Sequence, residues 1–226
     1  MYKFIHTTTL FILITLANFA SAASSKIGIL VFDGFLTSDV TAPVEVFGAA
    51  SKKAWFSSYE VVTISTTRKK QVKSEEGLSV VADYSIDDNV DIDVLIAPSA
   101  YDMDEHMNNK DLINFIREKG KHASWMSSNC SGANLLGQAG ILDGKKATTW
   151  AGGESALQSR FPKIDVQFDK NVVIDKGVIT SNGGPVSYQG AFALLAKLSS
   201  EKYANEIAQH IDFDRIGKAF MDSSNN

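Results

Sequence analysis

Continuous apolar runs alternate with amphipathic segments along this chain. The runs at 26–32, 59–65 and 91–97 are rich in Val, Ile and Leu, which is typical of strands buried on both faces of a parallel sheet. Residues 111–119 have the apolar spacing of an amphipathic helix, and Gly120 follows as its expected end. We therefore predict an α/β fold, with a mostly parallel central sheet and helices on both faces.

The remainder of the chain continues this alternation. Residues 78–82 predict a short strand in a hairpin with residues near Val72, and 172–174 and 178–180 predict two more short strands. Further helices are expected at 132–139, 153–160, 187–198 and 204–210. A length of 226 residues suits one such domain with a full core.

The only cysteine of the chain, Cys130, lies where the predicted strand at 122–127 turns into the helix at 132–139. A nucleophile at a sharp strand-to-helix turn is exposed above the sheet and faces the helix N-terminus. That position lowers the pKa of a thiol, and the thiolate is its reactive form. The alternative is that Cys130 is a small buried apolar residue.

Three separate segments reach the carboxyl edge of the predicted sheet, where open α/β sheets place their sites. They are Asp39, the loop at 98–100 and Cys130. Pro43 fits the first turn of a helix that runs to about Ser51. Asp39 would then lie just before this helix, and it either caps the helix or directs its carboxylate at the site.

The first 22 residues have the pattern of a secretory signal. Lys3 gives a positive start, 10–19 is largely apolar, and Ala20-Ser21-Ala22 matches the small-x-small cleavage rule. The apolar run is too short to span a membrane. We expect cleavage after Ala22 and an exported protein, periplasmic or secreted, with no membrane span.

Charge and cysteine content narrow the possible functions further. The net charge is −4, and it becomes −5 when residues 1–22 and their Lys3 are removed. No basic stripe is present, so we expect no nucleic-acid partner. No His/Cys cluster has metal-ligand spacing, and we predict neither a metal nor a cofactor. A lone cysteine in an exported protein indicates a reactive thiol or an intermolecular disulfide.

Several motifs together resemble the ThiJ/PfpI family of the class I glutamine amidotransferase-like superfamily. The resemblance covers the chain from Lys26 to about Arg215, and it is strongest to the branch of isonitrile hydratases and AraC-type regulator ligand domains. The matching segments are 39–47 (DVTAPVEVF), 130–133 (CSGA), 139–149 (AGILDGKKATT), 160–162 (RFP) and 177–181 (GVITS).

The resemblance implies a fold, a domain and a set of roles. The fold would be a flavodoxin-like three-layer sandwich with a cysteine nucleophile elbow, formed by a domain at 26–215 and followed by a tail at 216–226. Cys130 would be the nucleophile, and Asp39 would be the acid that hydrogen-bonds it. The backbone N–H groups of Ala100 and Ser131 would form the oxyanion hole. A homodimer is also implied.

Two positions depart from the family pattern. Relatives with a Cys-His pair carry histidine where this chain has Trp150, which either packs in the core or forms a wall of the pocket. The Pro-Gly-Gly loop of the family is Pro98-Ser99-Ala100 here, so we expect a narrower pocket or a reshaped loop. Of the other histidines, only His106 falls at the correct edge, and we treat it as a surface residue; His122 begins its strand at the opposite edge, and His210 lies in the last helix.

The leading hypothesis from these residues is a cysteine-dependent enzyme of isonitrile hydratase type. Cys130 would attack the electrophilic carbon of a small substrate, Asp39 would shuttle the proton, and water would release an N-substituted formamide. The alternatives are a non-enzymatic small-molecule binding or sensing module and a redox-reactive cysteine. No helix-turn-helix pattern follows residue 215, so we do not expect the binding module to contact DNA in that way.

Overall fold

The structure is a computed structural model, and it describes residues 25–53 and 58–216. The predicted signal at 1–22 and all of the predicted tail except Ile216 lie outside these residues. The strands of the main sheet are β1 (Ser25–Val31), β2 (Tyr59–Ser65), β5 (Tyr84–Ser85), β6 (Val94–Ala97), β7 (Trp125–Asn129), β10 (Val172–Asp175) and β11 (Val178–Ser181).

The sheet has the order β10-β11-β7-β6-β1-β2-β5. All pairings are parallel except that of β10 with β11, so the predicted mostly parallel sheet is confirmed. Strand order reverses between β1 and β6, because the chain leaves β1 toward β2 and returns on its other side. Such a switch point opens a crevice at the carboxyl ends of the two strands.

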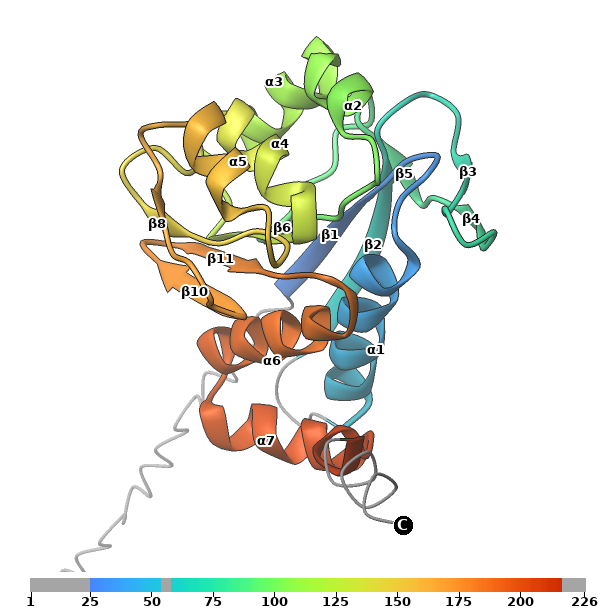
Figure 1. Cartoon of the computed structure of the whole chain (residues 1–226). Helices are drawn as coiled ribbons and strands as arrows, with labels where there is room; N and C mark the ends of the chain where they lie inside the picture. The colour runs from blue at the N-terminus through green and yellow to red at the C-terminus, as the bar shows by residue number, and fades with distance from the viewer. Residues whose placement is uncertain (1–24, 54–57, 217–226) are drawn as a thin grey trace, which may run out of the picture.

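Helices cover both faces of the sheet, as predicted (Figure 1). One layer holds α1 (Thr37–Lys53), α6 (Ser187–Leu198) and α7 (Glu201–His210). The other holds α2 (Asp104–Asn108), α3 (Lys110–Lys119), α4 (Ala133–Gln138) and α5 (Glu154–Arg160). Between the layers, the side chains of β1 and β6 are almost completely buried, which explains their unbroken apolar sequences.

Two small sheets lie beside the main one. The predicted hairpin is confirmed by β3 (Gln71–Lys73) and β4 (Ser79–Val81), which pair in antiparallel orientation. We did not predict the second sheet, in which β8 (Lys146–Ala147) pairs with β9 (Asp165–Val166) in parallel.

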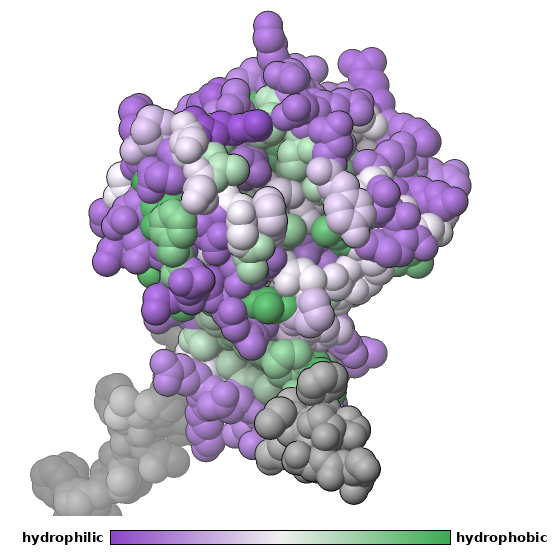
Figure 2. All heavy atoms as spheres, in the orientation of Figure 1, coloured by the Kyte–Doolittle hydropathy of each residue, from purple (hydrophilic) through white to green (hydrophobic). Residues whose placement is uncertain are grey.

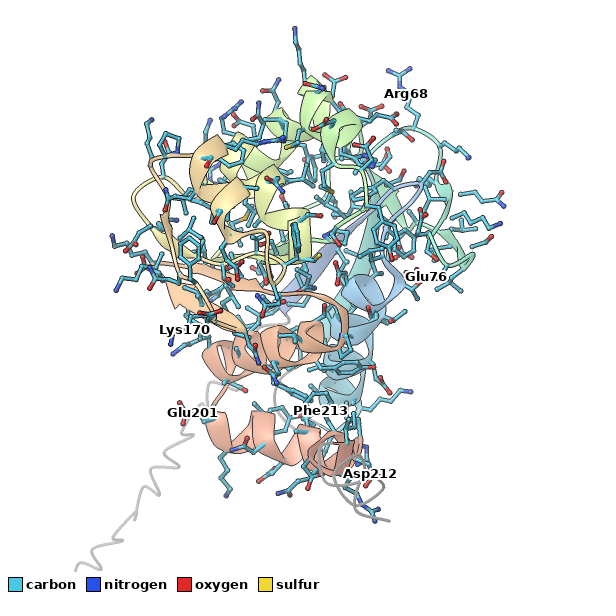
Figure 3. All side chains as sticks on the ribbon, in the orientation of Figure 1. Arg68, Glu76, Lys170, Glu201, Asp212 and Phe213 are labelled. Carbon is cyan, nitrogen blue, oxygen red and sulfur yellow. The ribbon has the colours of Figure 1, made fainter. Side chains whose placement is uncertain are left out.

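The start of α1 corrects a sequence prediction. Pro43 is not in the first turn, because α1 already begins at Thr37. The N–H and hydroxyl of Thr37 donate to Glu76 Oε2 at 3.0 and 2.6 Å, and Glu76 belongs to the β3–β4 hairpin (Figure 3). A carboxylate at a helix N-terminus satisfies a free N–H and offsets the helix dipole. A contact from the hairpin therefore extends the helix backwards by six residues.

The chain after α7 folds back on the helical layer. Phe213, in the short 3₁₀ turn Phe213–Arg215, packs against Tyr188 and Phe192 of α6, with ring centroids 5.1 Å apart in both pairs (Figure 3). The visible surface is mostly hydrophilic, and hydrophobic residues reach it around α6 and α7 (Figure 2). In the described part of the chain, no helix is long and apolar enough to cross a membrane.

Candidate active site

Cys130 occupies a strained turn between β7 and α4. Its φ angle is +52°, in the left-handed region that costs a non-glycine residue about 1–3 kcal/mol. A 3₁₀ turn over Cys130–Gly132 leads into α4. Close packing holds the turn: a Cβ added to Gly183, whose φ is +79°, would lie 2.2 Å from Cys130 Cβ. The structure therefore has the predicted nucleophile elbow.

Asp39 is completely buried and accepts four hydrogen bonds. The N–H and hydroxyl of Ser99 donate to its Oδ2 at 3.1 and 2.6 Å. The N–H of Gly184 and the hydroxyl of Ser187 donate to its Oδ1, both at 2.9 Å. The carboxylate thus joins α1, the loop after β6 and the start of α6. Asp39 is the third residue of α1 rather than the residue before the helix.

Pro43 helps to connect Asp39 with the elbow. A proline has no N–H, so it leaves the carbonyl four residues earlier without its usual helical hydrogen bond. That carbonyl belongs to Asp39, and it accepts a hydrogen bond from Asn129 Nδ2 at 2.9 Å. The opposite end of the same amide, Asn129 Oδ1, accepts from the Ser181 hydroxyl at 2.6 Å. The residue before the nucleophile is therefore fixed on both sides.

Asn129 also begins a formal glycosylation sequon with Cys130 and Ser131. Its side chain is 3% exposed, and both ends of its amide are hydrogen-bonded inside the protein. A glycan would have to displace both contacts, so the sequon plays no part in the site.

The electrostatics of Cys130 differ from the sequence prediction. Burial raises the pKa of its thiol, and the negative charge of Asp39 raises it further. Hydrogen bonds from Ser99 and Ser131 act in the opposite direction without reversing the shift. The predicted lowering of the thiol pKa is therefore wrong. The elbow holds Cys130 too deep, and too close to a carboxylate, for a resting thiolate.

Asp39 contacts the thiol less directly than the family resemblance implied. Among the described residues, no hydrogen bond joins the Asp39 carboxylate to Cys130, and its four bonds go to Ser99, Gly184 and Ser187. Burial raises the pKa of Asp39, while these four hydrogen bonds oppose the rise. A carboxyl group with a raised pKa takes up a proton more readily near neutral pH.

In the loop at 98–100, the backbone N–H predicted to form part of the oxyanion hole has another partner. The N–H of Ala100 is directed at Met103 Sδ, 3.1 Å away, and the Ala100 carbonyl accepts a hydrogen bond from the Ser131 hydroxyl at 3.1 Å. Hydrogen bonding from the Ser131 N–H lowers the pKa of the Cys130 thiol. Of the two predicted oxyanion donors, the Ala100 N–H is therefore already engaged by Met103 Sδ.

A hollow of about 270 Å³ adjoins the elbow at Ser131, and we call it the Ser131 hollow. Trp150 forms part of its wall and is 44% exposed, so it does not pack in the core. Tyr101, which is 79% exposed, is the second aromatic residue in its lining. Asp102, Asp104 and Arg160 add charged groups, and Arg160 pairs with Asp104 at 3.4 Å. The mouth of this hollow combines aromatic surface with a few polar groups, as small-molecule sites do.

His106 lines a different hollow of about 400 Å³ beyond β1 and β2, which we call the His106 hollow. Its ring packs on Phe32 with centroids 3.9 Å apart, so it is half-buried rather than the surface residue we expected. Burial lowers its pKa, although Glu105, Asp102 and Asp33 oppose the shift. His122 is exposed and lies in the turn before β7 instead of beginning that strand.

Sequence reasoning missed the loop after β11. Gly183, Gly184 and Ser187 contact Cys130 or Asp39, yet none of them was a candidate. The signal was available, because Gly183-Gly184-Pro185 follows the predicted strand at 178–180 after two intervening residues and so falls on the carboxyl edge of the sheet. Across residues 25–53 and 58–216, no group of three or more His, Cys, Asp or Glu side chains is placed to hold a metal ion.

The family model of the DJ-1/PfpI family matches residues 25–197. The chain belongs to the DJ-1/PfpI family. A solved ThiJ/PfpI family protein from Pseudomonas syringae superposes with a TM-score of 0.76 at 24% identity, over 92% of this chain and 82% of its own. The fold expected from the resemblance is therefore confirmed.

Relatives within the DJ-1/PfpI family have different activities. Protein/nucleic acid deglycase 2 of Escherichia coli is 29% identical over 72% of this chain and 90% of its own length. Isonitrile hydratase of Pseudomonas putida is 28% identical over 70% of this chain and 65% of its own length. The HTH-type transcriptional regulator GbdR of Pseudomonas aeruginosa is 22% identical over 84% of this chain, which spans about half the length of that regulator (51%).

Proposed function

We propose that this protein is a cysteine-dependent hydratase that adds water to a small electrophile of isonitrile type. The observation that carries the proposal is a buried Cys130 thiol, kept protonated by burial and by Asp39, in a site with only one of its two expected oxyanion donors. This combination is poor for acyl transfer, which needs a thiolate and a stabilised oxyanion.

Addition to an isonitrile makes different demands on the site. The sulfur bonds to the terminal carbon, and the same carbon takes the thiol proton, so that R–N≡C and Cys–SH give the thioimidate R–N=CH–S–Cys. Water then adds to this carbon, the C–S bond breaks, and the products are R–NH–CHO and the free thiol. A protonated thiol supplies both the sulfur and the hydrogen. The proton must move and return, for which Asp39 with its raised pKa is suited.

The Ser131 hollow supports a substrate with an apolar, flat substituent. Its volume of about 270 Å³ limits the substrate to a small molecule, and Trp150 and Tyr101 offer exposed aromatic surface beside the elbow. The similarity to isonitrile hydratase of Pseudomonas putida points to the same chemistry.

Turnover of an aryl isonitrile tests the proposal. We expect loss of the isonitrile infrared band and appearance of the N-aryl formamide, with the rate reduced at least about 10³-fold in Cys130→Ala. Ser128→Ala is the matched control: Ser128 is the buried neighbour of Asn129, and its hydroxyl has no hydrogen-bond partner in the described structure, so its rate should stay within twofold of wild type. Turnover that survives in Cys130→Ala would show that the thiol is not the nucleophile.

The second candidate function is a binding or sensing module without turnover. The observation that favours it is the Ala100 N–H, which is directed at Met103 Sδ instead of the site. In that case wild type and Cys130→Ala would bind the aryl isonitrile with equal affinity, measured by tryptophan fluorescence, and neither would release formamide.

Export from the cytoplasm is part of the proposal. It is supported by the signal pattern of residues 1–22. Mass spectrometry of the full-length protein expressed in a Gram-negative host should find a chain beginning at Ala23 in the periplasmic fraction. A chain that keeps residues 1–22 would contradict cleavage.

A further inference from the structure

Ser99 lies between the two groups that the mechanism must connect. It is completely buried, and its hydroxyl donates to Asp39 Oδ2 at 2.6 Å. The other oxygen of Asp39 is taken by Gly184 and Ser187. The carboxylate therefore has no free acceptor position directed at the thiol, and any proton that reaches it from Cys130 must arrive through one of its donors.

Sheet register places Ser99 beside Cys130. Strands β6 and β7 run in parallel with Ala97 opposite Ser128, so Ser99 and Cys130 take corresponding places two residues beyond. The flanking residues touch as well: the Ser131 hydroxyl donates to the Ala100 carbonyl at 3.1 Å. A Cβ on Gly132 would lie 2.3 Å from the Ala97 carbonyl oxygen. The loop thus follows the elbow closely.

The Ser99 hydroxyl has one proton and two lone pairs. In the resting site its proton is donated to Asp39 Oδ2, so the oxygen keeps lone pairs that can accept the S–H of Cys130, its neighbour in the sheet register. When the sulfur becomes anionic the same hydroxyl can donate to it instead, which is the direction in which Ser99 lowers the pKa of the Cys130 thiol.

We propose that Ser99 is a proton relay between Cys130 and Asp39. As Cys130 Sγ bonds to an electrophilic carbon, the S–H proton passes to Ser99 Oγ, and the Ser99 hydroxyl proton passes to Asp39 Oδ2. The serine regains its hydroxyl and the carboxylate becomes neutral. The reverse transfer returns a proton to the substrate carbon. The relay deepens the proposed function and uses a residue where the family pattern has glycine.

The relay predicts a distinctive pH profile of thiol alkylation by iodoacetamide. In this reaction the S–C bond forms, iodide leaves, and the proton goes to Asp39 and then to water. With the relay, the neutral thiol reacts while Asp39 is ionised, which gives a rate plateau at intermediate pH before the thiolate takes over at high pH. Without it, the rate rises tenfold per pH unit until the thiol ionises.

Ser99→Ala should abolish the plateau, with a loss of tenfold or more at pH 6 and less than about twofold above pH 10. Ser99→Thr keeps a hydroxyl and should retain the plateau. The matched control is Ser187→Ala, which removes a hydroxyl from the other oxygen of the same carboxylate. It should keep the plateau but start it at higher pH, because Asp39 loses one donor to its anion.

Two outcomes would overturn the relay: a wild-type profile in Ser99→Ala, or equal loss of the plateau in Ser187→Ala. If Ser99→Ala does not fold, Ser99→Gly provides the same test, with thermal unfolding as the check on its fold. Alkylation requires no isonitrile turnover, so the relay and the proposed function fail separately. A lost plateau in a protein that forms no formamide would reject the hydratase and keep the relay.

Discussion

The Ser131 hollow and the His106 hollow lie at the same edge of the sheet but differ in size and in the groups beside them. The His106 hollow is the larger, at about 400 Å³ against 270 Å³, and it contains His106, the one histidine that the described residues place at this edge. Its carboxylate Asp33 is held from outside the hollow, because it accepts from the Lys73 backbone N–H at 2.9 Å and from Lys69 Nζ at 3.2 Å. The smaller hollow reaches Ser131, the residue that follows the strained Cys130. We therefore choose the candidate site by backbone strain and buried charge, and not by the volume of the hollow.

The largest expected effect comes from Gly183→Ala, which tests whether close packing against Gly183 holds Cys130 in its strained conformation. A Cβ at this position would lie 2.2 Å from Cys130 Cβ and 2.8 Å from Cys130 N, so the elbow has to move in Gly183→Ala. We expect a loss of about 3 kcal/mol or more in the free energy of unfolding, from overpacking and the positive φ together, and a changed alkylation rate. Urea unfolding measures the first and iodoacetamide the second.

Gly140→Ala separates the cost of the positive φ from the cost of overpacking. Gly140 has nearly the same φ, +78° against +79°, but an added Cβ would have no neighbour within 4 Å. Its loss should be about 1 kcal/mol, the cost of the backbone conformation alone. Equal losses in the two variants would show that the Gly183 loop does not hold the elbow.

The second test adds a histidine to the Ser131 hollow and, in a separate variant, removes His106 from the His106 hollow. Trp150→His should place an imidazole beside the elbow, since the neighbouring Thr149 hydroxyl donates to the Cys130 carbonyl at 3.0 Å. A cationic imidazole there would lower the thiol pKa and raise the alkylation rate at pH 7 roughly tenfold. His106→Ala should leave the alkylation profile unchanged, because His106 packs on Phe32 in the other hollow.

Both results are measured as pH–rate profiles with iodoacetamide. An effect of His106→Ala as large as that of Trp150→His would mean that the two hollows are coupled electrostatically. The two hollows would then not be electrostatically independent.

Sequence reasoning found the parts of this site that depend on periodicity and chain order. Apolar runs located the strands, and the carboxyl-edge rule brought together Asp39, the loop at Ser99 and Cys130. These features follow from local pattern and sheet topology, which leave their signal in one stretch of chain at a time.

The remaining features depend on contacts between distant segments. Glu76 extends α1 from 39 residues away, and Met103 draws the Ala100 N–H toward its sulfur. The direction of the thiol pKa followed from the depth of Cys130 and its distance from a charge, which sequence does not encode locally. Asp39 could be placed at the edge, but its four donors could be counted only in the folded protein.

The smallest expected effect is on the pH dependence of stability. Asp39 and Asp33 should change the free energy of unfolding in opposite directions as the pH rises. Burial raises the pKa of Asp39 above its unfolded value of 3.8, whereas the pKa of Asp33 is lowered, chiefly by the hydrogen bond from the Lys73 backbone. A group with a raised folded pKa gives its full contribution below the unfolded pKa and loses it as pH rises through the folded pKa. The stability of wild type relative to Asp39→Asn should therefore fall on going from about pH 3.5 to pH 7, as the buried carboxyl group of Asp39 becomes charged.

Urea unfolding of both proteins across this pH range measures the difference, and the other carboxyl groups, Asp33 included, cancel because both proteins contain them. Asp33→Asn is the matched comparison from the His106 hollow, and its difference from wild type should change with pH in the opposite sense, since a lowered pKa adds stability as pH rises. If the Asp39 difference instead grew with pH, the four donors would outweigh burial, and Asp39 would be a permanent anion that anchors three segments and accepts no proton from Ser99.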